Sequence, residues 1–310
     1  MKLSVIIPVY KSENSIAPLV AELYVSLASI DFEVILVNDG SPDQSEWICM
    51  QLANTYENLR FISLRRNFGE FNAVMCGLNW ARGQFSVMID DDFQNPPEEI
   101  IQLLELAEEG DYDVVYTYYA KKEHARHRNW GSTGVNYLTS YLLNKPKDLY
   151  LSSFKLIRRE VVQEIVKYTG PYPYIDGLIF RTTRNIGRVQ VRHSKREEGA
   201  SNYTFSKLIT LLFNILFCYS SLPIRVFMPI SLGLLGIGLL LLLFLTGQWV
   251  MGPDPKQWQV VTATLIFLGG LQCTILSILG EYIGKGFMAQ SGQPQYVIKH
   301  NKHHSYDRQS

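Results

Sequence analysis

Two long uncharged runs near the end of the chain constrain its architecture most. Residues 226–253 contain no charged side chain, and neither do residues 257–280. At a rise of roughly 1.5 Å per residue, each run supplies the about 20 apolar residues that cross a hydrocarbon core about 30 Å thick. The sequence therefore predicts two transmembrane helices, at about 226–250 and 258–280, within a membrane segment over residues 223–285.

The short connection between the two runs turns the chain back on itself. It contains Pro253 and Pro255, and proline cannot continue a helix. Trp249 and Trp258 flank it, as tryptophans do at membrane interfaces. We therefore expect a helical hairpin whose two ends lie on the same side of the membrane.

Charges at the open end of this hairpin indicate its orientation. Arg225 and Lys285 lie just outside the two spans, whereas the connecting loop has one Lys against one Asp. The positive-inside rule then places both ends in the cytoplasm. The N-terminal apolar run does not read as a secretion signal, because Pro8 interrupts it and Lys11 follows. We expect a multi-pass protein of the inner (cytoplasmic) membrane, with a cytoplasmic domain over 1–202 and a cytoplasmic tail over 286–310.

The segment just before the first span, residues 203–222, carries an apolar stripe at helical spacing. The stripe is formed by Leu208, Leu211, Leu212, Ile215 and Leu216. An amphipathic helix lying in the membrane interface fits this pattern. A helix packed on the first domain fits it equally well.

The first domain alternates between strand and helix patterns. Strands are expected at 3–9, 33–37, 61–64, 85–89 and 113–117, and helices at 14–30, 45–56, 69–81 and 96–109. Such alternation predicts an α/β fold with a mostly parallel, Rossmann-like sheet and helices on both faces. Because no G-x-G-x-x-G motif follows the first strand, a dinucleotide-binding fold is not supported.

Polar clusters follow two of the predicted strands, at the sheet edge where such folds bind ligands. They are Asn38 with Asp39, and Asp90 with Asp92. Side chains two apart in an extended chain point the same way, so the latter pair offers the hard oxygen ligands that Mg²⁺ or Mn²⁺ prefers. Gln94 can add a neutral oxygen. The plainer alternative is a solvated acidic turn.

Six motifs follow one another in an order typical of one enzyme family. They are Val5-Ile6-Ile7-Pro8-Val9-Tyr10, Asn38-Asp39-Gly40-Ser41, Arg66-Asn67-Phe68-Gly69, Asp90-Asp91-Asp92-Phe93-Gln94-Asn95-Pro96-Pro97-Glu98, Lys195-Arg196-Glu197-Glu198-Gly199-Ala200-Ser201-Asn202-Tyr203 and Glu281-Tyr282-Ile283-Gly284-Lys285. On these motifs the chain resembles the family 2 glycosyltransferases, and in particular their polyisoprenyl-phosphate branch. The resemblance covers nearly the whole chain and implies the GT-A form of the α/β fold.

The resemblance also implies roles for individual residues. Nucleotide-sugar contacts fall on Pro8, Tyr10, Asn38, Asp39 and Asp91. Catalytic roles fall on Asp90, Asp92 and Arg196, and a Mg²⁺ or Mn²⁺ site on Asp90, Asp92 and Gln94. The acceptor phosphate would meet Arg128, Ser201 and Tyr203. For Arg128, which lies in a mixed-charge run, a solvated or lipid-facing loop is an equally open reading.

One departure from the family bears on the acceptor. Where some bacterial relatives carry an Asp in a G-D-F-R-L segment, this chain has Ser152-Ser153-Phe154-Lys155-Leu156, so no catalytic base is expected there. A sugar hydroxyl needs a base to become a nucleophile, whereas a phosphate monoester with a second pKa of about 6 is already mostly dianionic at neutral pH. The absence of a base therefore favours a phosphate acceptor.

The expected function is inverting transfer of a single sugar from a nucleotide-sugar, a UDP-sugar by resemblance, to a polyisoprenyl (undecaprenyl) phosphate. The product would be a lipid-linked sugar donor for modification of cell-envelope glycans. Expected partners are the nucleotide-sugar, the lipid phosphate and the membrane, and related proteins suggest a homo-oligomer. Lys+Arg and Asp+Glu both number 29, so overall charge does not point to nucleic acid.

Three other functions remain as alternatives. A processive polysaccharide synthase would share the sheet and aspartates, but it usually shows a Q-x-x-R-W element and more spans. A non-enzymatic membrane scaffold would carry a degenerate nucleotide site. A membrane-bound transferase could instead act on a non-lipid acceptor.

The histidine-rich end, His300-Asn301-Lys302-His303-His304, could in principle bind a metal. We expect a disordered polar terminus instead, because chain ends are poorly ordered unless tied down.

Overall fold

The computed structural model describes residues 1–119, 151–170, 173–192, 257–290, 292 and 294–303. The chain divides into two compact units, Met1–Thr204 with Gln293–Ser310, and Phe205–Gly292. The first predicted span, the segment 203–222 and the predicted site residues Arg128, Arg196, Ser201 and Tyr203 lie outside the described residues.

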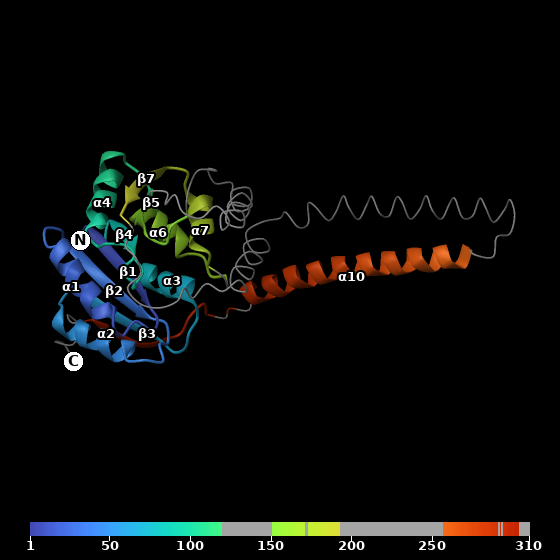
Figure 1. The fold of residues 1–310 in the computed structure, drawn as a ribbon, viewed down its shortest axis with the longest axis horizontal. Coiled ribbons are helices and arrows are strands. Elements are labelled where there is room, and N and C mark those ends of the chain that lie inside the picture. The colour runs from blue at the N-terminus through green and yellow to red at the C-terminus, as the bar shows by residue number, and fades with distance from the viewer. Residues whose placement is uncertain (120–150, 171–172, 193–256, 291, 293, 304–310) are drawn as a thin grey trace. The chain divides into compact units, whose positions relative to one another are not determined.

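The larger unit is built on an eight-stranded sheet in the order β7-β5-β6-β4-β1-β2-β3-β8 (Figure 1). The strands are β1 (Leu3–Val9), β2 (Phe32–Asn38), β3 (Leu59–Leu64), β4 (Phe85–Met88), β5 (Val114–Tyr119), β6 (Lys155–Arg158), β7 (Ile186–Val191) and β8 (Ile298–His303). The five strands expected from the sequence are confirmed as β1 to β5. The central strands are buried on both faces, which agrees with their almost uninterrupted runs of apolar residues.

The sheet is mixed. Strands β4, β1, β2 and β3 are parallel neighbours, and β5 and β7 are parallel to each other. Strand β6 is antiparallel to both β4 and β5, and β8 is antiparallel to β3. The sheet is thus mostly parallel, as predicted, and it contains two antiparallel strands, β6 and β8, that the sequence did not predict.

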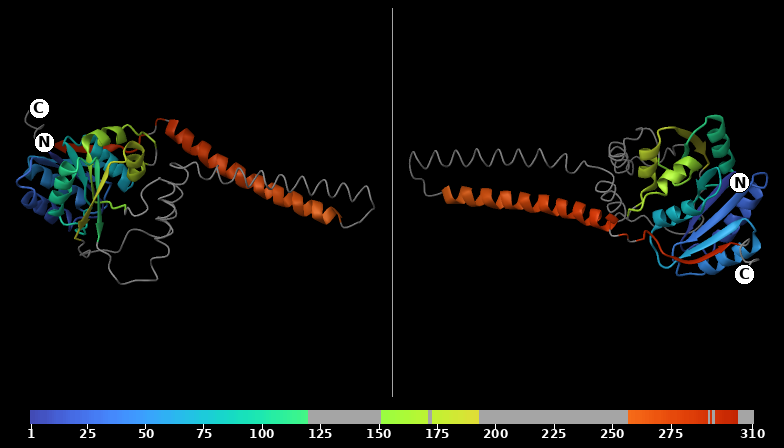
Figure 2. Two further views of the ribbon diagram at one scale, coloured as in Figure 1. Left: turned by 90° about the horizontal axis from the view of Figure 1, so that it is seen from above. Right: turned by 180° about the vertical axis from the view of Figure 1, so that it is seen from behind.

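Helices cover both faces of the sheet, as the sequence predicts (Figures 1 and 2). They are α1 (Ile16–Ser26), α2 (Ser45–Thr55), α3 (Glu70–Trp80), α4 (Glu99–Glu109), α6 (Arg159–Ile165) and α7 (Ile175–Thr182). Helices α1, α2 and α4 share one core with Val5 and Ile7 of β1. Helix α3 packs on the other face, where Gly77 lies directly against Ile6. The Phe180 ring of α7 stacks on Tyr116 of β5, with centroids 6.2 Å apart.

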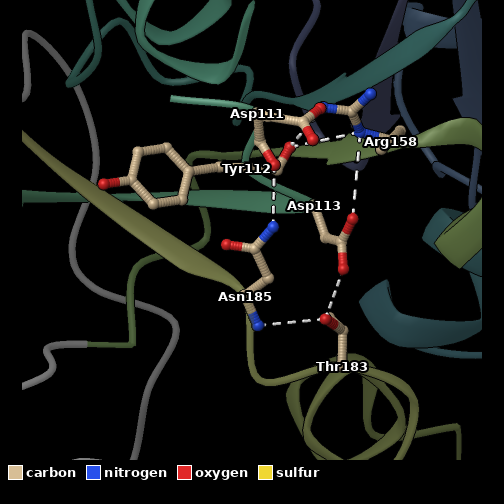
Figure 3. Close-up of polar contacts among 6 residues, drawn as sticks. All are labelled: Asp111, Tyr112, Asp113, Arg158, Thr183 and Asn185. Atoms are coloured by element: carbon tan, nitrogen blue, oxygen red, sulfur yellow. Dashed lines mark hydrogen bonds and ion pairs between the residues drawn. The ribbon is translucent and has the colours of Figure 1, made fainter. Parts of the chain in front are cut away.

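A polar network holds the strands β5, β6 and β7 together at the amino end of β5 (Figure 3). Arg158 donates to Asp111 at 2.7 Å and to the Tyr112 carbonyl at 3.2 Å. Thr183 donates its hydroxyl to Asp113 at 2.5 Å, and Asn185 donates to the Asp111 carbonyl at 2.7 Å. The predicted site follows the carboxyl ends of the strands. These contacts lie at the other end of the strands.

The expectation of a disordered C-terminal tail is wrong for residues Ile298–His303. They form β8, which pairs with β3 from Leu64↔Ile298 to Arg60↔His303. Main-chain hydrogen bonds to an open sheet edge need no apolar side chains, so this strand lacks the hydrophobic alternation that would reveal it.

In the second unit, the structure describes one helix, α10 (Gln257–Gln290), which contains the second predicted span (Figure 2). Among the described residues, no helix combines the length and the hydropathy needed to cross a membrane. The hairpin therefore stays a prediction. Several large apolar side chains on α10 are exposed: Leu265, Leu276, Leu279, Ile283 and Phe287.

Candidate active site

Three parallel strands end together and bring their polar residues to one edge of the sheet. Val9 of β1 pairs with Asn38 of β2, and the Asp39 N–H donates to the Val9 carbonyl at 2.9 Å. On the other side of β1, the Ile89 N–H donates to the Ile6 carbonyl at 3.1 Å, just before Asp90. The sequence prediction that these clusters share an edge is confirmed.

Asp39 shapes the loop that follows β3. Its two carboxylate oxygens accept the backbone N–H groups of Phe68 at 2.7 Å and Gly69 at 2.9 Å. Burial raises the pKa of Asp39, and these two N–H groups counteract part of that rise. Gly40 lies so close to this loop that a Cβ would meet the Arg66 carbonyl carbon at 2.5 Å. Asp39 thus holds this loop in place through two hydrogen bonds. Its contact with a nucleotide remains a prediction.

Asn38 is fully buried beside Asp39 and links the ends of neighbouring strands. Its amide donates to the Ser63 hydroxyl of β3 at 3.1 Å, and its carbonyl accepts the Ser41 N–H at 3.2 Å. The Ser41 hydroxyl in turn accepts the N–H of Lys11 at 3.2 Å. These bonds order the turn that follows β2 next to the end of β1.

Asp91 ties residues 90–95, here called the aspartate loop, to the end of β1. It accepts the Ser12 hydroxyl and, at 3.3 Å, the N–H of Tyr10. Desolvation raises the pKa of Asp91 to about 6; the Ser12 and Tyr10 bonds oppose that rise, and repulsion from Asp90 and Asp92 adds to it. Tyr10 itself remains 37% exposed and Pro8 is half-buried, so both can still meet a ligand.

Asp90 and Asp92 lie just after β4, and their role as a metal-binding pair stays a prediction. Asp90 accepts the Ser153 hydroxyl at 2.5 Å, and Asp92 accepts the backbone N–H of Gln94 at 3.1 Å. Phe93, between Asp92 and Gln94, has a φ of 58°, which produces the tight turn. Carboxylate and amide oxygens suit Mg²⁺ or Mn²⁺. Within the parts of the chain that the structure describes, no group of three or more His, Cys, Asp or Glu side chains is arranged to hold a metal.

The segment before β6 supports the aspartate loop. The sequence did not predict this contact. Beside the Ser153 bond to Asp90, Ser152 lies 3.4 Å from the Tyr119 hydroxyl, which donates to Asn95 at 2.8 Å. Asp90 and Asn95 are thus held at the two ends of the loop. The signal in the sequence was weak: two adjacent serines before Phe154, with no strand predicted after them.

A buried charged group lies behind this segment. Lys155 pairs with Asp176 of α7, which also accepts the Tyr116 hydroxyl at 2.7 Å. Glu70, the first residue of α3, has an exposed side chain, yet desolvation by the surrounding protein raises the pKa of its carboxyl to about 7. Repulsion from Asp90 adds to this rise, and Lys155 opposes it. Sequence reasoning missed these residues, because single charged side chains within helix and strand patterns give no signal.

Comparisons with known proteins give relatives along nearly the whole chain. The Glycosyl transferase family 2 model matches residues 4–166, which span the sheet from β1 to α6. The "Undecaprenyl-phosphate 4-deoxy-4-formamido-L-arabinose transferase" of Photorhabdus laumondii is 32% identical over 304 residues, covering 96% of this chain and 93% of the relative. The protein of the same name from Proteus mirabilis is also 32% identical over 304 residues, with the same coverage.

Solved structures share the fold. Glucosyl-3-phosphoglycerate synthase from Mycobacterium tuberculosis, in complex with Mn²⁺, UDP and phosphoglyceric acid, superposes with a TM-score of 0.53 at 20% identity. The match covers 69% of this chain and 76% of that one. A complex of the same enzyme with Mg²⁺ and UDP gives 0.53 at 19% identity over 71% and 79% of the two chains.

The fold and these relatives define a glycosyltransferase with the α/β architecture called GT-A. The chain belongs to glycosyl transferase family 2.

Proposed function

We propose that this enzyme transfers a single sugar from a UDP-sugar to undecaprenyl phosphate, with inversion at the anomeric carbon. The observation that carries the proposal is the similarity over 96% of the chain to relatives named as undecaprenyl-phosphate sugar transferases. The similarity also covers 93% of the relatives, so it extends over nearly their whole length.

Asp90 and Asp92 would hold a divalent cation, Mg²⁺ or Mn²⁺, with Gln94 as a further oxygen ligand. Their carboxylates suit such an ion, and the two solved structures described above were obtained with Mn²⁺ or Mg²⁺ together with UDP. When bound, the cation supplies positive charge next to the diphosphate leaving group. Ser153 would hold Asp90 in orientation through its hydroxyl.

The donor nucleotide would lie against the ends of β1 and β2, where Pro8, Tyr10, Asn38 and Asp39 are placed. Asp39 contributes by fixing the Phe68 and Gly69 backbone beside it. Asp91 contributes by holding the Tyr10 backbone. The nucleotide contacts themselves belong to the proposal.

For the acceptor, the chain offers positioning in place of proton removal. A phosphate monoester is mostly dianionic at neutral pH, so its oxygen can attack the anomeric carbon without a base. The chain has Ser153 where a carboxylate base stands in some relatives. We assign the acceptor phosphate to Arg128, Ser201 and Tyr203, and further phosphate contacts to Arg196.

The enzyme would reach its lipid acceptor through a transmembrane hairpin at about 226–250 and 258–280, with the larger unit in the cytoplasm. The uncharged sequence of both runs supports this topology, as do the exposed apolar side chains of α10 within the second run, Leu265 and Leu276. Confinement to the membrane raises the effective concentration of a lipid acceptor. Assembly as a homo-oligomer through these segments belongs to the same proposal.

A panel of labelled nucleotide-sugars, offered to the purified chain in membranes that contain undecaprenyl phosphate, tests this function. We expect label in the organic-extractable lipid with one uridine donor and Mg²⁺ or Mn²⁺. We also expect no transfer with Asp92→Ala and full transfer with Asp31→Ala, a carboxylate that is exposed and pairs with the N-terminus. Label that appears only in an aqueous product would show a non-lipid acceptor, and full activity after complete chelation would contradict the metal site.

A further inference from the structure

After the second unit the chain returns to the first unit, where an ordered segment pairs with β3 at the side of the sheet. Residues 294–303, here called the C-terminal strap, follow α10 and end in β8. Along β8 the strap pairs with β3 and packs beside α2, where Lys299 donates to Glu46 at 3.0 Å. The strap is therefore part of the larger unit, here called the catalytic unit. In sequence, the whole second unit separates the strap from the rest of the catalytic unit.

Side chains anchor the strap just before β8. The Gln295 amide donates to two backbone carbonyls of the connection between α6 and α7, Tyr168 at 3.0 Å and Gly170 at 2.7 Å. The Tyr296 hydroxyl hydrogen-bonds with Cys76 and Asn79 of α3. These anchors fix the main chain at the next residue, Val297.

The strap then reaches the loop that follows β3, residues 65–69. The Val297 carbonyl accepts the Arg65 N–H at 2.9 Å, at the first residue of this loop. Asp39 accepts the N–H groups of Phe68 and Gly69 at the other end. The loop is thus held at its start by the strap and at its end by Asp39.

The strap is built for this contact more than for adding apolar core. Ile298 is half-buried, and the residues after it are Lys299, His300, Asn301, Lys302 and His303, of which the first three are exposed. Polar, lysine-containing strands are common at protected sheet edges. The contribution of the strap therefore comes through main-chain bonds and the anchors of Gln295 and Tyr296.

We propose that the C-terminal strap positions loop 65–69 for nucleotide binding. This rests on the proposed function, since it places the donor beside Asp39. A loose strap would free the Arg65 end of the loop and weaken donor binding, while Asp90 and Asp92 would keep their places. The signature is a raised KM for the donor with kcat little changed.

The test uses the full-length chain with the double change Gln295→Ala and Tyr296→Phe, which removes both side-chain anchors and keeps the β8 backbone. The matched control is Lys299→Ala on the same strap, since an exposed ion pair contributes little. We expect UDP binding to weaken about fivefold and the KM for the donor to rise about fivefold, since a few net hydrogen bonds are lost. We also expect faster hydrogen exchange at the amides of Arg65, Phe68 and Gly69, with no such changes in the control.

Unchanged exchange in loop 65–69 would overturn the inference, and so would faster exchange without loss of UDP affinity. An equal loss in kcat and kcat/KM would also overturn it, because it would place the effect on the chemical step. If the double variant fails to fold, Gln295→Ala alone gives the same readouts. A wild-type chain that binds no uridine nucleotide would refute the proposed function, and the exchange rates would then decide alone whether the strap holds the loop.

Discussion

Ser153 is the residue through which the segment before β6 acts on the aspartate loop. Its hydroxyl donates to Asp90 at 2.5 Å, while its own side chain is exposed. A hydrogen bond to a charged group contributes about 1.5–3 kcal/mol. We predict that Ser153→Ala lowers kcat/KM by about tenfold or more, since 1.4 kcal/mol corresponds to a factor of ten.

The Ser153 prediction is checked on the metal as well as on turnover. Mn²⁺ affinity measured without donor should also fall in Ser153→Ala, because Asp90 loses its orienting partner. Ser153→Thr keeps a hydroxyl and should recover most of both losses. Normal Mn²⁺ affinity and turnover in the alanine variant would show that the bond to Asp90 has no role in the site.

Glu70 gives the site a pH-dependent stability. Desolvation, followed by repulsion from Asp90, raises the pKa of its carboxyl to about 7 in the folded chain. An unfolded glutamate titrates near 4.3, so the folded state binds this proton more tightly and loses stability as pH rises from about 4 through 7. Because Glu70 is exposed, water screens part of this effect.

We therefore predict that Glu70→Gln stabilises the metal-free protein at pH 8 and makes little difference at pH 5. Thermal unfolding of both proteins at several pH values, with a chelator present, measures this difference. A gap between their Tm values that does not widen as pH rises would contradict the assignment.

At the residue scale, the sequence predicted the charged pair and missed its supports. Asp90 and Asp92 were recognisable because two carboxylates two residues apart follow an apolar strand. Ser153 lies far from Asp90 in sequence, and only the antiparallel pairing of β6 with β4 brings it there. Glu70 was hidden in a helix start, where an acidic residue is ordinary.

At the element scale, Gly77 sets how closely α3 packs on β1. A Cβ at this position would meet the Ile6 Cγ2 atom at 2.4 Å, inside the buried core. Alanine favours helix by about 1 kcal/mol over glycine, but overpacking a core costs typically about 1–3 kcal/mol. We predict that Gly77→Ala lowers the free energy of unfolding by about 1–2 kcal/mol.

Denaturant unfolding checks the Gly77 prediction, with Ile6→Leu as the partner change. Leucine has no Cγ2 methyl on its Cβ, so the extra alanine carbon should cost less in the Ile6→Leu background. A double-mutant cycle then gives a favourable coupling between the two positions. Zero coupling, or a more stable single variant, would mean that this contact does not limit the packing.

The elements that the sequence predicted are those with strong periodicity. The strands β1 to β5 contain apolar runs, and the helices α1 to α4 contain apolar stripes. All of these elements form. Strand β6 has four residues and helix α6 seven, too short for a period to show. Strand β8 is polar and pairs with a strand more than two hundred residues earlier in the chain, which no local pattern encodes.

At the scale of the whole molecule, the catalytic unit is discontinuous in sequence. It ends at Thr204, gives way to the second unit, and resumes at Gln293. A segment that reads as a tail therefore supplies an edge strand to the sheet. The boundaries 1–202 and 286–310 stay a prediction about the order of the segments along the chain.

The last prediction concerns how the second unit meets the membrane. Leu265 is 64% exposed on α10 and lies close to the middle of the predicted span 258–280. An arginine at the centre of a spanning helix costs about 2.5–3.5 kcal/mol on insertion. We predict that Leu265→Arg reduces the carbonate-resistant membrane fraction several-fold, whereas Leu265→Ala leaves it unchanged. The detergent-purified full-length variant should meanwhile keep its affinity for UDP, because the change lies outside the catalytic unit. If carbonate releases the wild-type chain, the hairpin is wrong; if it retains the arginine variant as fully as the wild type, Leu265 does not lie in a span.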